Sequence, residues 1–530
     1  MIPDPSRSIL QTSVLIAGAG PVGLSLACEL GRLGIECVLV EKRDGSINVP
    51  KMSMVSSRVM EFCRRWGIAD QVRKAVWPES HALDFVYVTS LKGRELARVK
   101  VPSYKDRKLA FTPEGACHCP QIYFDPILTA HVRTLPNVSL RYGLRLDAFT
   151  QTSHGVSASL TALDTGDGLT IHADYLVGCD GPGGIVRAAL GIELGGLGRV
   201  ANSANIYFRS KELPFLHDNG WARIYRTVDA SGCWAELIPI DGVELWRLSV
   251  FDDPEAAANP PATLRRLMGA DFPFELIDVS PWERRDFVGA SFGRGRVFLA
   301  GDAVHQCSPT GGFGMHMGIE DAMNLAWKLA ATIEGWGGPN LLGSYELERR
   351  PIDARNVAIS TRNYKQIEEI PGWDDTLAKA GQLDPAVEWR DHLIALGGGE
   401  IEKIQYCYEF SPICIADGTP EIVYDVRHFQ PTTRPGARAP HVWLADGRST
   451  LDLYGDGFVL LRFGEAGVEG LLKEAARCKI PLRVVDIGEA EAAAIYQRRL
   501  VLVRGDGHVA WRGDALPGDP AALLARVTGG

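Results

Sequence analysis

The sequence predicts an α/β protein with more than one domain, and three observations lead to this fold class. The first 41 residues contain an apolar run, a glycine-rich turn, a stretch with helical spacing of apolar residues and a second apolar run. Residues 200–280 contain strand after strand, separated by Gly, Asp and Asn. Beyond residue 425, short strands and helices alternate again. These patterns predict a parallel sheet, an inserted antiparallel sheet and a small C-terminal α/β domain.

Length and composition fit this reading. At roughly 150 residues per domain, 530 residues allow two to four domains. The 56 basic and 65 acidic residues give a net charge of −9 without a basic patch, so no nucleic-acid partner is expected. The longest apolar stretch, 14–30, is interrupted by glycine and proline and is shorter than the ~20 residues of a membrane span. Eleven scattered cysteines, an odd number, favour reduced thiols and a cytoplasmic location.

The N-terminal unit is a strand–helix–strand crossover. Ser13–Ala17 and Cys37–Val40 are the apolar strands, and Pro21–Leu33 has the helical pattern between them. Such a βαβ unit forms a right-handed crossover in a parallel sheet. The turn between its first strand and its helix is therefore placed at a carboxyl edge of that sheet.

That turn carries a dinucleotide-binding pattern. Gly18, Gly20 and Gly23 would provide the tight turn, the close approach of the backbone to a pyrophosphate and the helix–strand packing, while Pro21 opens the helix. The helix N-terminus attracts phosphate. Glu41, at the end of the second strand, would accept both ribose hydroxyls of an AMP moiety and repel a 2′-phosphate. The pattern alone does not separate NAD from FAD, and a turn that merely packs is the alternative.

Further elements follow from periodicity and turn residues. We expect helices at 57–66, 127–135 and 315–333 and after Pro351, strand-like alternation over 84–101, and an apolar strand ending at Asp180. The stretch containing Gly397–Gly399 and the proline-rich 431–440 is the expected linker. After it we expect strands at 458–462, 482–487, 500–503 and 508–511, alternating with helices at 469–478, 490–498 and 520–527.

Two later stretches favour FAD. One strand ends in Asp180-Gly181, and another, RVFLAGD, ends in Asp302, which is placed to bind a hydroxyl of a ribityl chain. Gly312 and its glycine neighbours allow the backbone to approach a flat ring system. The helix from Met315 directs its positive end there, and this would stabilise the negative charge of a reduced flavin.

The three motifs, in this order and spacing, resemble those of the class A FAD-dependent aromatic hydroxylases. The stretches PGARAPHVWL and VLVRGDGHVAWR resemble the thioredoxin-like tail of the phenol and polyketide hydroxylase branch. The resemblance implies a Rossmann-like FAD-binding domain and a monooxygenase that uses NADPH or NADH and O2. It would hydroxylate a phenolic or polyketide-like aromatic substrate through a flavin C4a-hydroperoxide. A flavin epoxidase or ring-modifying monooxygenase, and a flavin-binding protein without turnover, stay open as alternatives.

The resemblance also implies roles for individual residues. Pro309 and His316 would act in catalysis, Pro309 through a carbonyl beside the reacting ring, although a turn-forming proline explains the residue equally well. No metal ligands are implied. The residues implied to contact the cofactor are Gly18, Gly20, Pro21, Gly23, Glu41, Lys42, Lys51, Gln121, Leu146, Asp180, Gly301, Asp302, Pro309, Gly312, Gly314, Met315 and His316.

The chain departs from the family pattern at four positions. Lys51 replaces an arginine, Gly184 a serine with a capping role, and His316 an asparagine beside the flavin. His316 could hydrogen-bond the ring or tune its potential, or it could simply pack. Ser53 stands where phenol hydroxylases have an aspartate near the substrate hydroxyl, so the catalytic base is not identified. Among the strands of 200–280, Glu236 and Tyr225 are candidates to face the substrate.

The expected domains follow from these assignments. The FAD-binding domain would comprise 1–80, 104–185 and 285–400, the substrate-binding domain 81–103 and 186–284, and the thioredoxin-like domain 425–530. Gly195–Gly198 is read as a loop, so no second dinucleotide site for the nicotinamide is expected. The last domain has only Cys478 and cannot exchange disulfides. We expect it to be structural and to pack against a neighbouring subunit in a homodimer. Cys117-His118-Cys119 is read as two free cysteines around a histidine rather than a metal site.

Overall fold

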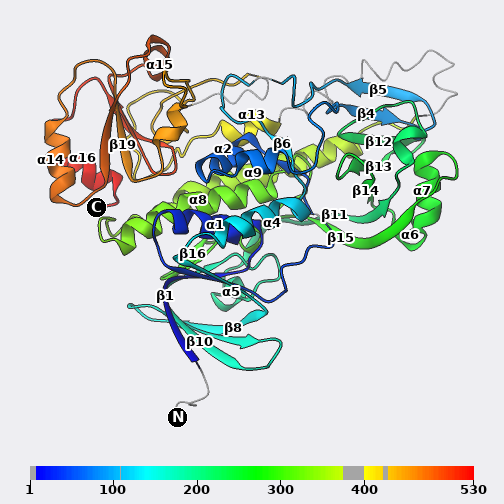
Figure 1. Cartoon of the computed structure of the whole chain (residues 1–530), viewed down its shortest axis with the longest axis horizontal. Helices are drawn as coiled ribbons and strands as arrows, with labels where there is room; N and C mark the ends of the chain where they lie inside the picture. The colour runs from blue at the N-terminus through cyan, green and yellow to red at the C-terminus, as the bar shows by residue number, and fades with distance from the viewer. Residues whose placement is uncertain (1–7, 50, 108, 374–398, 422–427) are drawn as a thin grey trace.

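The computed structural model describes residues 8–49, 51–107, 109–373, 399–421 and 428–530. Two eight-stranded sheets and one four-stranded sheet organise this part of the chain, with a layer of long helices between the first sheet and the C-terminal domain (Figure 1). A two-stranded ribbon, β3(Met54–Val55) with β6(Cys117–His118), joins two loops beside the helices.

The first sheet has the strand order β16-β17-β10-β1-β2-β7. Its central pairings, from β17 through β10, β1 and β2 to β7, are all parallel, while β8 and β9 continue antiparallel from the other half of β10. The predicted βαβ crossover is confirmed. The strands are β1(Ser8–Ala17), β2(Cys37–Glu41), β7(Val138–Tyr142), β8(Leu144–Gln151), β9(Val156–Ala162), β10(Gly168–Gly178), β16(Gly293–Arg294) and β17(Val297–Leu299).

Helices cover this sheet and bury its apolar strands. Val14, Leu15 and Ile16 of β1 are fully buried against the apolar faces of α1 and α8. The helices and short turns of this part are α1(Pro21–Arg32), α2(Ser57–Arg65), α3(Ala69–Arg73), α4(Gln121–Val132), α5(Ile185–Ala189), η2(Gly301–Ala303), α8(Gly314–Ile333), α9(Ser344–Glu368) and α13(Gly399–Ile404). Of the expected linker, 397–398 lie outside the described residues, and Gly399 begins α13.

Two helix boundaries differ from expectation. α4 begins at Gln121 rather than 127, and α9 begins at Ser344 and continues through Pro351. Proline in a helix interior costs about 3 kcal/mol. Burial of the turns on either side of Pro351, including Arg349 and Asp353, offsets that cost.

The second sheet has the order β18-β15-β11-β14-β13-β12-β4-β5 and is antiparallel except for the parallel pair β12–β4. One of its faces is apolar and is covered by α6(Pro254–Ala258) and α7(Pro260–Met268). The strands and the short turn beside them are β4(Phe85–Val88), β5(Glu95–Val99), β11(Leu194–Arg209), η1(Leu213–Phe215), β12(Ile224–Asp229), β13(Gly232–Pro239), β14(Leu245–Phe251), β15(Glu275–Gly289) and β18(His305–Gln306).

The prediction of a loop at Gly195–Gly198 was wrong. These residues belong to β11 and pair with β15, with a register shift between Gly195 and Gly198. The glycines of a β-bulge and those of a loop look alike in a sequence, because both structures can require a residue with positive φ. Gly196 has φ 137°.

The C-terminal domain has the predicted βαβαββα order, with a sheet ordered β20-β19-β21-β22. Its core is continuous with the helical layer, because Trp327 of α8 contacts Phe458 of β19 with ring centroids 6.0 Å apart. It therefore packs on its own chain. Its elements are η3(Thr450–Leu453), β19(Phe458–Arg462), α14(Glu469–Arg477), β20(Leu482–Asp486), α15(Ala490–Tyr496), β21(Leu500–Val503), β22(Val509–Gly513) and α16(Pro520–Val527).

The proline-rich stretch 431–440 is not an exposed linker, contrary to the sequence-based expectation. Residues 435–440 are buried, and Arg438 donates to Glu61 of α2 through Nε at 3.0 Å and through a second, shorter contact. Composition marked the boundary between two domains, but the buried ion pair fixes the segment at their interface.

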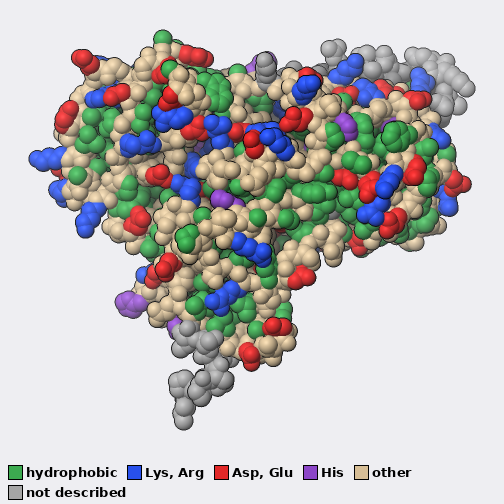
Figure 2. Space-filling model, viewed as in Figure 1, with side chains coloured by type: hydrophobic (Ala, Val, Ile, Leu, Met, Phe, Trp, Pro, Cys, Tyr) green, Lys and Arg blue, Asp and Glu red, His purple; other side chains and the backbone are tan. Residues whose placement is uncertain are grey.

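The exposed surface mixes charges of both signs. On the face shown in Figure 2, acidic and basic side chains alternate over the C-terminal and second-sheet parts. Within the described residues, no helix has both the length and the apolar character required to cross a membrane.

Candidate active site

The glycine turn after β1 has three different environments at its three glycines. Gly18 has φ 105°, and a Cβ there would lie 2.3 Å from the carbonyl oxygen of Cys179. A Cβ on Gly23 would lie 1.9 Å from the carbonyl oxygen of Gly18. A Cβ on Gly20 would meet no protein atom within 4 Å. Two glycines thus close the packing between α1 and the sheet, and the third opens onto free space at the helix N-terminus, where Pro21 occupies the first turn.

Glu41 is held at the end of β2 by backbone groups. Its Oε2 accepts from the N–H of Ala19 at 3.0 Å, and its Oε1 accepts from the N–H of Arg43 at 2.9 Å. The carboxylate therefore lies beside the glycine turn with lone pairs left for further donors. Lys42 follows it and is exposed.

The end of β10 shows how the chain accommodates Gly184. Asp180 Oδ2 accepts from the N–H of Val186 at 3.1 Å and so caps α5. A Cβ on Gly184 would lie 2.0 Å from the carboxyl carbon of Asp180, so a serine would displace this carboxylate. Burial raises the pKa of Asp180. Its Oδ1 is buried and has no hydrogen-bond partner among the described residues.

Asp302 follows β17 at the same edge of the sheet. The preceding Gly301 has φ 65°, and its N–H donates to Asp321 Oδ2 at 3.0 Å. The Asp302 residue is exposed, and its only hydrogen bond among the described residues is accepted by its backbone carbonyl, from Gln306 Nε2 at 3.4 Å. Although the residue is exposed, protein atoms packed around its carboxyl group disfavour the charged form and raise its pKa, while the charges of His305 and Lys51 lower it. This carboxylate is free to accept from a ligand hydroxyl.

The loop between β18 and α8 forms a tight glycine turn. The N–H of Gly312 donates to the carbonyl of Pro309 at 2.9 Å, and Gly311 has φ 92°. This is the geometry of a type II turn, which requires a positive φ at its third residue. Pro309 is exposed, and no side chain among the described residues caps the first turn of α8, which contains Gly314 and Met315. The first-turn N–H groups of α8 and the positive end of its helix dipole therefore point toward the carboxyl edge of the first sheet.

His316 ties this loop to the segment before α2. The N–H of Ser56 donates to His316 Nε2 at 3.0 Å, and Nε2 also lies 3.1 Å from the carbonyl oxygen of Met54. Nδ1 lies 2.5 Å from the carbonyl oxygen of Gly312. The imidazole is 3% exposed. Because both nitrogens contact the backbone, the geometry favours a role in holding the glycine loop over a hydrogen bond to a ring.

Lys51 and Gln121 lie together, and the Lys51 charge acts on Asp302. The N–H of Lys51 donates to Gln121 Oε1 at 3.3 Å, and Gln121 Nε2 donates to Asp125 Oδ2 at 3.0 Å. Burial raises the pKa of Asp125 to about 7, against the effect of Gln121 and Lys51. Leu146 is separate from this group, because its side chain packs in the core on β8 opposite Leu160.

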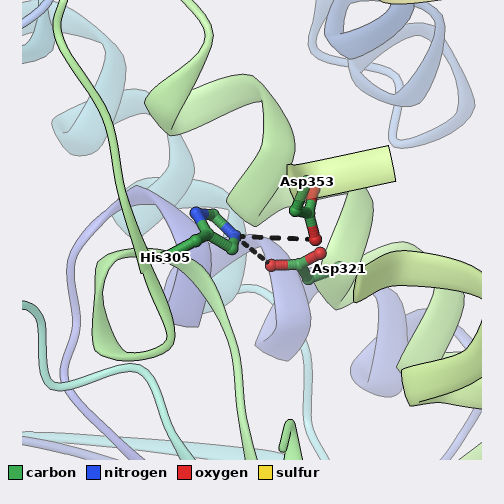
Figure 3. Close-up of side chains that lie close together, drawn as sticks. All are labelled: His305, Asp321 and Asp353. Atoms are coloured by element: carbon green, nitrogen blue, oxygen red, sulfur yellow. Dashed lines mark hydrogen bonds and ion pairs between the residues drawn. The ribbon is translucent and has the colours of Figure 1, made fainter. Parts of the chain in front are cut away.

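A buried ionic cluster of His305, Asp321 and Asp353 (Figure 3) holds the turn before Asp302, because Asp321 accepts from the N–H of Gly301. His305 Nε2 lies 2.7 Å from Asp321 Oδ2 and 3.9 Å from Asp353 Oδ2, and the three side chains point toward one another. One ligand atom from each lies within 4.8 Å of the others, as in a metal site. Arg349 already donates to both carboxylates, at 2.8 Å to Asp321 and 2.7 Å to Asp353. We therefore interpret the cluster as an ion-pair network.

The charges of this cluster are strongly coupled. Burial opposes ionisation of Asp321, but His305 and Arg349 outweigh it and hold its pKa well below the usual range. Burial also opposes a charge on His305, yet Asp321 and Asp353 raise its pKa to about 9. Asp321, Arg349 and Asp353 were missed in the sequence. They could have been recognised as charged residues at positions of α8 and α9 whose neighbours in the helix are buried.

The second sheet has a polar face, which Arg284 joins to the Pro309 loop and Arg247 joins to the carbonyl of Lys51. Glu236 lies on that face next to Arg226, whereas Tyr225 lies in the apolar core under α6 and α7 and donates to the carbonyl of Gly220. Of the two substrate-facing candidates, the structure therefore supports Glu236 only. Cys117 and Cys119 are buried free thiols, and His118 Nε2 contacts the carbonyl of Ile240 at 3.0 Å.

The residues converge on a site that fits FAD. The glycine turn and Glu41 suit the AMP half, Asp302 can accept from a ribityl hydroxyl, and the uncapped α8 can face an anionic ring. All lie at the carboxyl ends of β1, β2, β10 and β17, where ligands bind in open parallel sheets. These features define a flavin-dependent oxidoreductase.

Comparisons with known proteins agree. Residues 11–360 match the family described as FAD binding domain, and residues 432–529 match that described as aromatic-ring hydroxylase, C-terminal. The chain is 30% identical to the FAD-dependent monooxygenase apdD of Emericella nidulans, covering 99% of this chain and 91% of that protein. It is 31% identical to aklavinone 12-hydroxylase RdmE of Streptomyces purpurascens, covering 98% of each.

Solved structures give the same result. A chromopyrrolic acid-soaked RebC with bound 7-carboxy-K252c has a TM-score of 0.92 at 38% identity, over 98% of this chain and all of that one. The chain belongs to the class A FAD-dependent aromatic hydroxylases, in the branch that carries the C-terminal hydroxylase domain. It is an FAD-dependent monooxygenase, and NAD(P)H is the reductant typical of its class.

Proposed function

We propose that this monooxygenase hydroxylates a phenolic or polyketide-like aromatic ring. The observation that carries the proposal is the position of the polar face of the second sheet beside the loop of Pro309, where the flavin ring is expected. Arg284 on β15 donates to the side chains of Ser308 and Thr310, at 3.1 and 3.3 Å, and so connects the two. Relatives whose names specify an aromatic polyketide substrate, such as aklavinone 12-hydroxylase, support this substrate class.

When bound, FAD supplies the activation of O2 after reduction by NADH or NADPH. The chain's own residues bind and orient the reactants. Gly20 gives the pyrophosphate room, Glu41 and Asp302 accept from ribose and ribityl hydroxyls, and the N–H groups at Gly314 and Met315 face the ring. His316 fixes the loop that carries Pro309, and Gln121 and Lys51 are joined by a hydrogen bond. Lys42, Asp180 and the backbone at Leu146 complete the proposed contact set.

The proposed domains follow the sheets. The FAD-binding domain would comprise 1–80, 104–185 and 285–400, the substrate-binding domain 81–103 and 186–284, and the thioredoxin-like domain 425–530. Strands β4, β5 and β11 to β14 fall within the second of these, whereas β15 crosses the boundary at 284 and β18 of the same sheet falls in the first. We also propose a cytoplasmic homodimer without a nucleic-acid partner, which the net charge of −9 and the free cysteines support.

The test is consumption of NADH and NADPH by the purified FAD-loaded protein in the presence of simple phenols and polycyclic phenolics. The expected result is consumption stimulated by at least one compound, with a product that contains one additional oxygen atom. Consumption that yields only hydrogen peroxide with every compound would contradict the substrate class. An epoxide or a cleaved ring as product would establish one of the alternative monooxygenase reactions instead.

A further inference from the structure

We propose that Glu236 is the general base that takes the phenolic proton from the substrate, an assignment that rests on the proposed hydroxylation of a phenol. Ser53 carries no carboxylate, so the base must come from another element. Glu236 comes from β13, on the sheet that faces the reacting loop.

The strand register places Glu236 at the centre of the polar face. It is opposite Arg226 on β12 and opposite Ser249 on β14, and Ser249 is in turn opposite Asn205 on β11. Ser249 donates to Asn205 at 2.7 Å. Because side chains alternate across a strand, the neighbouring Ala235 and Leu237 point into the apolar core on the other face. Glu236 therefore lies in a row of polar groups rather than in packing.

Cations surround this carboxylate. Arg226 Nε lies 3.5 Å from Glu236 Oε2, and the two side chains are 4% and 16% exposed. Arg226 also donates to the Tyr87 hydroxyl on β4 at 2.6 Å. Arg247 on β14 and Arg284 on β15 both interact electrostatically with Glu236, as does Cys233 on its own strand. Three buried arginines act on Glu236, and Glu368 also acts on Arg284, so the arginines outnumber the carboxylates that act on them and can stabilise a further negative charge.

Two of these cations connect the face to the expected flavin position. Arg284 donates to Ser308 and Thr310 on either side of Pro309, and also to Ser203 on β11 at 3.0 Å. Arg247 donates to the carbonyl of Lys51 at 3.5 Å. A ring bound between these two contacts would have Glu236 at its edge.

A buried hydroxyl on the same face also indicates a polar ligand. Tyr207 lies opposite Arg247, is 2% exposed, and its hydroxyl has no hydrogen-bond partner among the described residues. An unsatisfied buried hydroxyl costs free energy that a bound ligand oxygen would recover. Tyr207 is therefore placed to donate to an oxygen of the substrate.

The step itself is a proton transfer. The phenol O–H bond breaks, its electron pair stays on the phenol oxygen, and the proton moves to a carboxylate oxygen of Glu236. Arg247 and Arg284 stabilise the resulting phenolate, whose ring is a stronger nucleophile toward the transferred oxygen. After oxygen insertion, the ring carbon that received the oxygen loses its hydrogen as a proton to solvent, and its C–H electron pair restores the aromatic ring and the phenolate. Glu236 then returns its proton to the phenolic oxygen, so the base is regenerated.

The experiment compares Glu236→Gln with Glu236→Asp and a matched control, Asp278→Asn. Asp278 lies on the same face, opposite Tyr207, but on β15 and hydrogen-bonded to Ser280. The substrate is the phenol from the panel that the wild-type holoenzyme hydroxylates fastest. Because general base catalysis contributes about 10²- to 10⁴-fold, Glu236→Gln should reduce hydroxylation at least about a hundredfold at neutral pH. FAD content should stay that of the wild type.

The pH profile separates a base from a structural residue. The activity of Glu236→Gln should recover as the pH approaches about 10, where a phenol ionises without a base. Glu236→Asp retains a carboxylate and should keep more activity than Glu236→Gln, while Asp278→Asn should resemble the wild type. Wild-type hydroxylation rates for Glu236→Gln, loss of activity that high pH does not restore, or a loss in Asp278→Asn alone would overturn the assignment. If the wild type itself hydroxylates no phenol, the proposed function fails, and Glu236 loses its role with it.

Discussion

Two alanine substitutions in the dinucleotide turn separate cofactor contact from packing. In Gly23→Ala, the new carbon would lie 1.9 Å from the Gly18 carbonyl oxygen and 3.3 Å from Cβ of Cys179. Real Cβ contacts are essentially never below 3.0 Å, so α1 and the Gly18 carbonyl would have to separate by about 1.1 Å or more. Overpacking of this kind costs about 1–3 kcal/mol. Gly23→Ala should therefore destabilise the apoprotein as well as weaken FAD binding.

Gly20→Ala should have a different effect. Its Cβ meets no protein atom within 4 Å, so the stability of the apoprotein should change by less than about 1 kcal/mol. The methyl group would instead occupy the space proposed for the pyrophosphate. We expect FAD affinity to fall at least tenfold, which corresponds to about 1.4 kcal/mol. Denaturant unfolding of the apoproteins and flavin fluorescence titrations measure the two quantities. Wild-type FAD affinity for Gly20→Ala would show that Gly20 does not face the pyrophosphate, and an unchanged apoprotein stability for Gly23→Ala would show that Gly23 does not close the packing of α1.

Three further predictions concern the Asp302 turn, the buried ionic cluster and the C-terminal domain. Asp302→Ala should lose FAD during gel filtration, because alanine removes the carboxylate that is proposed to accept a hydrogen bond from a ribityl hydroxyl. A variant that stays yellow with full FAD stoichiometry would disprove that contact. His305 has a higher pKa folded (about 9) than unfolded (6.5), so its ion pair stabilises the fold fully below pH 6.5 and is lost as pH rises through about 9. Unfolding of wild type and His305→Gln across this range should converge at high pH, and parallel curves would contradict the prediction. Arg504→Met removes a fully buried ion-pair partner of Glu348 and should lower the free energy of unfolding in urea by about 3–5 kcal/mol. Arg498→Met removes an exposed partner of Asp514 and should lower the same free energy by less than about 1 kcal/mol. Equal losses in the two variants would show that burial does not set the effect.

Local patterns predicted the framework of this protein well. Strand β1, helix α1 and strand β2 follow from apolar runs on either side of a glycine turn, and α16 begins and ends where the apolar spacing places it. Asp302 and Gly314 could be placed at one edge of the sheet because the carboxyl ends of parallel strands meet there. These assignments need only sequence-local information.

Features that depend on distant contacts could not be predicted. The strand character of Gly195–Gly198 depends on pairing with β15, and the burial of 435–440 depends on Glu61, almost 380 positions from Arg438 along the chain. His316 looked like a candidate to touch the ring, but its partners Ser56 and Gly312 come from separate loops. Glu236 was one of two candidates, and only the strand register separates it from Tyr225.

The most direct test of the account is oxygen incorporation from isotope-labelled O2. The FAD-loaded protein would be incubated with NAD(P)H and the phenol that most stimulates its consumption, and the product analysed by mass spectrometry. A monooxygenase with the proposed function gives a hydroxylated ring that carries one labelled oxygen atom for each NAD(P)H consumed in coupled turnover. A product without the label, or stimulated consumption that yields labelled peroxide and an unchanged phenol, would contradict it.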